Sequence, residues 1–88
     1  MIISDVKVVN RAGIHTRPAA SLVKLASEFK SEIQIIRDSF VINAKSIIGV
    51  MTLAAEMGSE LLLSFEGEDE KEASEEISDY FNRGFDEL

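Results

Sequence analysis

The stretch Asn10–Ala20 holds the residues of this chain whose types and spacing could do chemistry. It contains the sole histidine, His15, and the sole proline, Pro18, of the 88 residues. Gly13 can adopt the backbone angles of a sharp turn between a strand and a helix. Pro18 suits the first turn of a helix, where a missing N–H group costs nothing. His15 is therefore predicted at or beside the N-cap of a helix.

The surroundings of His15 indicate a site for an anion. The backbone N–H groups of Thr16 and Arg17 are expected to be free at the helix start, where the helix dipole is positive. The guanidinium of Arg17 can hold two phosphate oxygens at once. A nucleophilic imidazole, a helix N-terminus and an arginine together indicate a histidine that carries a phosphoryl group.

Other roles for a lone histidine fit less well or stay open. Metal binding is a poor fit, because the chain has no cysteine and no second histidine to complete a usual ligand set. A Ser-His-Asp hydrolase is also a poor fit, since so short a chain has little room for a substrate cleft. We therefore expect no metal and no cofactor. A solvated or capping histidine is the alternative that the local residues alone leave open.

The elements that must position His15 follow from the spacing of apolar residues. Alternation predicts four strands, over residues 2–9, 32–37, 40–43 and 60–66. Helical spacing predicts three helices, over residues 16–29, 47–53 and from 69 to the neighbourhood of 83. Asp38-Ser39 is the predicted hairpin turn. Ser46 is predicted to cap the second helix, and Asp69 to open the third in a capping box with Glu72.

The order βαββαβα predicts an α+β fold with an open-faced two-layer sandwich. Four antiparallel strands with three helices packed on one face would bury every apolar stripe. The helical stripes are Ala19, Leu22, Val23, Ala26 and Phe29 in the first helix and Ala73, Ile77, Tyr80, Phe81 and Gly84 in the last. Residues 1–88 are expected to form a single domain, because this length supports one modest core.

Composition and charge exclude several classes of protein. With 45% hydrophobic residues the chain is expected to be globular. The net charge of −7 argues against a nucleic-acid partner. Its acidic excess lies in residues 66–88, which we interpret as a solvated helix face. No apolar run has the length of a membrane span, so we expect no membrane insertion, and the absence of cysteine suits the reducing cytoplasm.

Two motifs resemble those of the HPr family, the histidine-containing phosphocarrier proteins of the bacterial sugar phosphotransferase system. The stretch Gly13–Ala19 resembles the active-site signature of that family, and Asn43–Met51 resembles its regulatory-serine segment. The two motifs lie at the family's usual distance apart, and the resemblance covers all 88 residues. It implies the HPr fold, with the strand order 1-4-2-3.

The resemblance also implies a function, that of a general phosphocarrier and not an enzyme. A phosphoryl group would pass from phospho-enzyme I to Nδ1 of His15, beside Arg17, and then to sugar-specific enzyme IIA domains. Ser46 matches the serine phosphorylated by HPr kinase/phosphorylase in members that control carbon metabolism. The protein is expected to be a monomer. Its docking surface would be formed by the starts of the first two helices, at Thr16, Ala20, Lys24, Ile47, Ile48 and Met51.

Two other functions compete with carriage of phosphate toward sugars. One is a regulatory phosphocarrier of the nitrogen-related type, which signals without sugar transport. The other is a binding module on the same scaffold that is never phosphorylated on histidine and acts through Ser46 and the apolar patch. The presence of His15 argues against the second, while the sequence leaves the first open.

Overall fold

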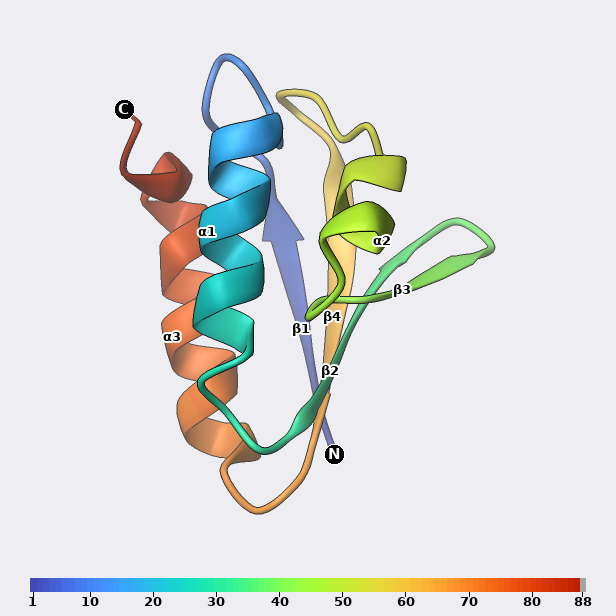
Figure 1. Ribbon diagram of the computed structural model, residues 1–88, viewed down its shortest axis with the longest axis vertical. Coiled ribbons are helices and arrows are strands. Elements are labelled where there is room, and N and C mark those ends of the chain that lie inside the picture. Colours follow the sequence, from blue (N-terminus) through green and yellow to red (C-terminus); the bar gives the residue numbers. More distant parts are fainter. Residues whose placement is uncertain (88) are drawn as a thin grey trace.

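A four-stranded antiparallel sheet forms one layer of the molecule (Figure 1). The computed structural model describes residues 1–87. Strand β4 lies between β1 and β2, with Leu63 opposite Ser4 on one side and Ile35 on the other. The order β1-β4-β2-β3 confirms the predicted topology. The strands are β1 (Ile2–Lys7), β2 (Glu32–Arg37), β3 (Phe40–Asn43) and β4 (Glu60–Glu66).

The helices cover one face of this sheet and leave the other face open, as predicted (Figure 1). Among residues 1–87, no helix is long and apolar enough to cross a membrane. The single-domain organisation over 1–88 stays a prediction, and position 88 lies outside the described residues. The helices are α1 (Thr16–Ala26), α2 (Ile47–Thr52), α3 (Glu70–Asn82) and the short 3₁₀ helix η1 (Gly84–Asp86).

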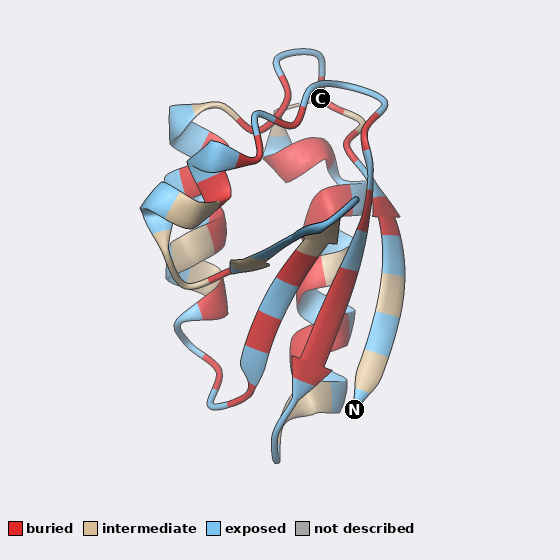
Figure 2. Ribbon diagram, turned by 90° about the vertical axis from the view of Figure 1, so that its right-hand side faces the viewer, coloured by how far each residue is buried: buried red, intermediate tan, exposed pale blue. Residues whose placement is uncertain are grey.

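The core lies between the helices and the inner face of the sheet. Alternate strand residues are buried, so that Ile33 and Ile35 face the helices while Gln34 is exposed on the open face (Figure 2). Leu22 of α1 and Phe81 of α3 are fully buried against this face. Each large apolar side chain removed from water contributes roughly 1.5–3 kcal/mol to stability. This packing holds α1 and α3 against the sheet.

Strand β1 and helix α1 end two and three residues earlier than predicted, and α2 ends one residue earlier, at Thr52. Strand β1 stops at Lys7 instead of residue 9, because Val8 bonds to the turn that precedes β4: its N–H donates to Ser59 O and its carbonyl accepts from Gly58 N. Helix α1 stops at Ala26 instead of residue 29. The N–H of Phe29 donates to the carbonyl only three residues back, so the chain leaves the helix while its ring stays buried.

The predicted caps have different outcomes. Ser46 caps α2 as predicted, since its Oγ accepts a hydrogen bond from Gly49 N at 3.1 Å. Asp69 precedes α3, but the capping box with Glu72 is wrong. The Asp69 carboxylate instead accepts from the backbone N–H groups of Lys30 and Ser31, at 2.8 and 2.9 Å. It makes no bond to its own helix because it holds the loop between α1 and β2.

Candidate functional site

The loop before α1 is held against the segment that precedes β4. Gly13 has φ +72°, a conformation that favours glycine, and an added Cβ would lie 2.5 Å from the carbonyl oxygen of Ala55. The next residue, Ile14, is buried and donates its N–H to the same oxygen at 2.8 Å. Gly13 and Ile14 therefore both lie against the Ala55 carbonyl, which fixes the turn. The next residue, His15, is thereby placed at the start of α1.

His15 is the N-cap residue of α1, as predicted. Its carbonyl accepts from Ala19 N at 2.9 Å, but its side chain makes no capping hydrogen bond. The imidazole is 39% exposed and remains available for chemistry. Thr16 and Arg17 are the first two residues of the helix, where N–H groups have no intrahelical acceptor. The predicted arrangement of imidazole, amides and arginine is thus present.

Glu87 joins this group, and the sequence interpretation missed it. Its two carboxylate oxygens lie 3.1 and 3.0 Å from Nε2 of His15. Oε2 also lies 3.7 Å from Nε of Arg17, whose side chain is 81% exposed. The buried amide of Asn10 donates to Oε1 at 2.8 Å. The tail of the chain therefore reaches back to His15.

These contacts set the charge of the Glu87 carboxyl. The hydrogen bond from Asn10 lowers the pKa of Glu87 below its ordinary value, and the His15 contact and the Arg17 charge act in the same direction. Partial burial opposes them without reversing the result. Glu87 is accordingly a carboxylate at neutral pH, and it places a fixed negative charge beside one nitrogen of His15.

A tight turn after α3 explains why Glu87 reaches His15. Phe85 and Asp86 both have left-handed backbone angles, with φ 57° and 61°. The Phe85 ring is buried edge-on against Tyr80 and Phe81, with ring centroids 5.3 and 4.9 Å away. The interpretation of residues 66–88 as a solvated face is therefore wrong for Glu87. An apolar residue directly after Gly84 was the sequence signal for this turn.

Known proteins of similar sequence decide the family. A family model described as the PTS HPr component phosphorylation site matches residues 3–83. The chain belongs to the HPr family. It is 51% identical over 87 residues to the phosphocarrier protein HPr of Treponema pallidum, with 99% of each chain covered.

Solved structures of HPr proteins agree with this assignment. The crystal structure of HPr-C-His from Thermoanaerobacter tengcongensis has a TM-score of 0.96 and 40% identity, covering 100% of this chain and 99% of that chain. A structure described as an HPr dimer from the same organism has a TM-score of 0.74 and 40% identity, covering 91% and 92%. The family assignment confirms the resemblance drawn from the two motifs, and the chain is an HPr-type phosphocarrier.

The residues expected to form the HPr docking surface lie on the two helices next to the site. Helices α1 and α2 pack side by side (Figure 1). On α2, Ile48 is 78% exposed, and Ile47 and Met51 are about half as exposed, at 40% and 42%. The α2 residues line one shallow apolar hollow together with Thr52. Those on α1, also exposed, are Thr16, Ala20 and Lys24.

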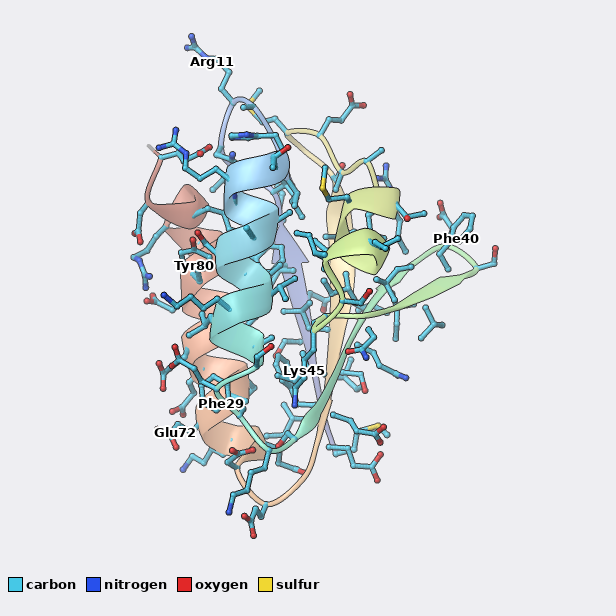
Figure 3. All side chains as sticks on the ribbon, viewed as in Figure 1. Arg11, Phe29, Phe40, Lys45, Glu72 and Tyr80 are labelled. Atoms are coloured by element: carbon cyan, nitrogen blue, oxygen red, sulfur yellow. The ribbon has the colours of Figure 1, made fainter. Side chains whose placement is uncertain are left out.

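The second HPr motif surrounds the cap of α2. Ser46 is partly exposed, and its hydroxyl is engaged with Gly49 N. Lys45 extends toward the C-terminal end of α1, away from His15, because its Nζ donates to the carbonyl oxygen of Phe29 at 2.7 Å (Figure 3). It thereby satisfies a carbonyl just after the end of α1. No group of side chains suited to hold a metal ion occurs within residues 1–87.

Proposed function

We propose that this protein carries a phosphoryl group on His15 within the sugar phosphotransferase system. It would accept the group from phospho-enzyme I and pass it to sugar-specific enzyme IIA domains, without a metal or cofactor of its own. The observation that carries this proposal is the exposed imidazole at the N-cap of α1, beside two helix-start amides and Arg17. Membership in the HPr family supports it independently.

The chemistry that this arrangement suits is a pair of in-line displacements. A lone pair of the His15 imidazole attacks phosphorus while the bond from phosphorus to the donor breaks. In the second displacement a nucleophile of the acceptor attacks phosphorus while the bond from phosphorus to the imidazole nitrogen breaks, and its electron pair returns to that nitrogen. Amides at the helix start and the Arg17 guanidinium would stabilise the negative phosphoryl oxygens. This stabilisation is the main catalytic requirement of phosphoryl transfer. Because the same group enters and leaves, the protein acts as a stoichiometric carrier and not as an enzyme.

The proposed docking surface unites the exposed side chains of α1 and α2. Apolar residues at the centre of a contact and basic ones at its rim suit proteins that bind several partners. We propose a cytoplasmic monomer, although one solved relative is described as an HPr dimer. Light scattering coupled to size-exclusion chromatography measures the oligomeric state of this chain directly. The surface consists of Thr16, Ala20, Lys24, Ile47, Ile48 and Met51.

We further propose that Ser46 is a regulatory phosphorylation site, with a kinase of the HPr kinase/phosphorylase type as its partner. Its partly exposed hydroxyl at the cap of α2 adjoins Ile47 of the docking surface. A phosphate there adds about two negative charges at neutral pH. Such a charge would act on partner binding, because it stands at the edge of the apolar hollow.

The central test uses His15→Ala. Incubation with enzyme I, magnesium and labelled phosphoenolpyruvate should place label on the unmodified chain that is lost in acid and stable in base. The variant should take up no such label, because it lacks the only imidazole. Its unfolding free energy should change by no more than about 0.5–1 kcal/mol, since a partly exposed side chain is removed. Acid-labile label on the variant would refute the proposal, as would its absence from the unmodified chain.

A further inference from the structure

Asn10 is a buried amide whose orientation is fixed by its neighbours. Only 1% of the residue is exposed. Its Nδ2 donates at 2.8 Å both to the carbonyl oxygen of Gly13 and to Oε1 of Glu87. Both partners can only accept, so exchanging the amide N and O would set oxygen against oxygen at both contacts. The amide oxygen has no hydrogen-bond partner. Asn10 therefore serves as a double donor, at the cost of one unsatisfied acceptor.

The Glu87 carboxylate determines which ring nitrogen of His15 carries the hydrogen. An ionised carboxylate only accepts hydrogen bonds. Nε2 of His15 lies 3.0–3.1 Å from both of its oxygens, so Nε2 must carry the hydrogen. In the neutral imidazole, Nδ1 is then the nitrogen with the free lone pair. The geometry thus selects one of two tautomers, and with it the nucleophilic atom.

The turn after α3 holds the carboxylate in place before any phosphoryl group arrives. Two successive non-glycine residues, Phe85 and Asp86, stand in the left-handed region, which costs free energy. Burial of the Phe85 ring against α3 compensates for that cost. A free tail would gain nothing from such a conformation. The strained turn is explained if it serves to hold the Glu87 carboxylate beside His15.

Resting on the proposed carrier function, we propose that Asn10 and Glu87 form a clamp that positions His15. The clamp keeps Nε2 protonated, so that Nδ1 accepts the phosphoryl group, and its carboxylate balances the charge of the phosphorylated ring. The Nδ1 lone pair forms the bond to phosphorus while the donor's bond breaks, and the ring becomes an imidazolium that retains its Nε2 hydrogen. On release, the electrons of the Nδ1–P bond return to Nδ1. No proton moves in either direction.

Among the charged groups of residues 1–87 that lie near His15, only Glu87 is placed to act as the counter-ion of its ring. Arg17 contacts the same carboxylate at 3.7 Å, and it can turn toward phosphoryl oxygens while the carboxylate stays on Nε2. Asp86 and Arg11 line a surface hollow beside His15 and Glu87. Asp86 is paired with Arg83, whose Nε lies 2.7 Å from it. Arg11 projects from the loop toward solvent (Figure 3). Glu87 is therefore the acid placed to stabilise a positive ring.

The test combines three variants with a charge-matched control. Glu87→Ala removes the carboxylate, Glu87→Gln removes its charge alone, and Asn10→Ala removes its support. Glu76→Gln deletes an acid from the exposed face of α3 and serves as the control. Nitrogen-15 NMR of the unphosphorylated imidazole reports the tautomer and requires no phosphotransfer. The unmodified chain and the control should show predominantly Nε2–H, and Glu87→Ala a mixture of tautomers.

The phosphorylated chain supplies a second measurement. Release of the phosphoryl group to water or to an acceptor, followed against pH, reports protonation of the ring. Its midpoint should move to lower pH in both Glu87 variants, because they lack the charge that stabilises the imidazolium, and release at pH 7 should slow about tenfold. Asn10→Ala should change the same quantities by less. Since Asn10 is buried, the unfolding midpoint of the Asn10→Ala variant is measured in parallel, so that a loss of stability is not taken for a loss of support to Glu87.

The outcomes separate the clamp from the carrier function. An unchanged Nε2–H population in Glu87→Ala would overturn the clamp, even if the protein carries phosphate normally. An unchanged pH midpoint in both Glu87 variants would overturn the role of the carboxylate as a counter-ion. If the unmodified chain accepts no phosphoryl group, the proposed function fails, while the tautomer measurement still decides whether the clamp exists.

Discussion

His15 faces two opposite electrostatic environments. Its backbone begins a helix, whose first amides favour an anion, while its Nε2 touches the Glu87 carboxylate. Arg17 stands between them, 3.7 Å from Glu87 and largely exposed. A largely exposed arginine with so weak an ion pair could move to an arriving phosphoryl group at little cost. The resting contact of Arg17 with Glu87 thus keeps the guanidinium close to His15, where the proposed function would bring a phosphoryl group.

Replacing Arg17 should slow transfer without harming the fold. We expect Arg17→Ala to reduce the rate of phosphoryl acceptance from enzyme I by more than about tenfold, because a charge-assisted contact is worth roughly 1.5–3 kcal/mol. Arg17→Lys should restore only part of the rate, since an ammonium lacks the planar fork. Arg11→Ala removes the same charge from the neighbouring loop and should have a smaller effect. Wild-type rapid-mixing kinetics in both Arg17 variants would contradict a phosphate-binding role.

At the scale of elements, the site depends on where short segments are pinned. The loop before α1 is fixed by the contact between Gly13 and Ala55, and α2 begins at the Ser46 cap. Neither segment is held mainly by its own intrinsic propensity. Helix α2 has only six residues, too few to be stable alone in water. Substitutions at these two points should therefore act on the site through the backbone.

Gly13→Ala should displace the loop that carries His15. The added Cβ would meet a carbonyl oxygen at 2.5 Å, and the backbone stands at φ +72°. We expect a loss of about 1–3 kcal/mol in the free energy of unfolding, together with slower phosphoryl acceptance. Gly58→Ala is the matched control, because its φ is +93° but nothing lies within 4 Å of the added Cβ. Urea denaturation of both variants separates the clash from the conformational strain. Equal losses in the two would show that the close contact is unimportant.

Ser46→Asp should leave α2 folded and weaken docking. Aspartate is as good an N-cap as serine, so the thermal midpoint should be equal or slightly higher. The added negative charge lies next to the apolar hollow of α2. A partner surface that attracts the basic Arg17 and Lys24 is acidic, so it would repel this charge. Acceptance from enzyme I should slow mainly through a raised apparent KM. Ser46→Asn, which caps without charge, should behave like the unmodified chain. Unaltered kinetics in Ser46→Asp would leave Ser46 as a cap only.

For the whole molecule, local patterns predicted much of the architecture, and long-range packing decided the remainder. The bounds of β2 and β4 follow from alternation, because buried residues alternate with exposed ones along most of each strand. In β3 only Ile42 is partly buried, and the strand was predicted from its place after the Asp38-Ser39 turn. His15 and Arg17 were identifiable because a lone histidine and an arginine flank a helix start. Glu87 was not, since its role depends on a turn stabilised by Phe85 and on a contact 72 residues away along the chain. The capping box predicted for Asp69 was wrong for the same reason, because the hydrogen-bond donors to its carboxylate are distant in sequence, at Lys30 and Ser31.

The charge distribution also has meaning at this scale. A group of acids in the final quarter of the chain is exposed on α3, where Figure 3 labels Glu72. These acids are Glu72, Glu75, Glu76 and Asp79. The proposed docking residues lie on α1 and α2 instead, away from this acidic excess. A strongly negative face favours solubility and opposes association through that face. Under the proposed function, partners that approach His15 would therefore meet a largely apolar and basic surface.

The strand order has a consequence for how the chain acquires its shape. Strand β4 sits between β1 and β2, yet it is the last strand along the chain. The β2–β3 hairpin can form early, because its two strands are joined by a two-residue turn. Strand β1 must wait for a partner that begins at Glu60, so roughly two thirds of the chain emerges from the ribosome before the sheet can close. Such non-local pairing slows folding relative to a helical bundle of similar size. During synthesis the apolar face of α1 therefore remains uncovered until β4 is inserted.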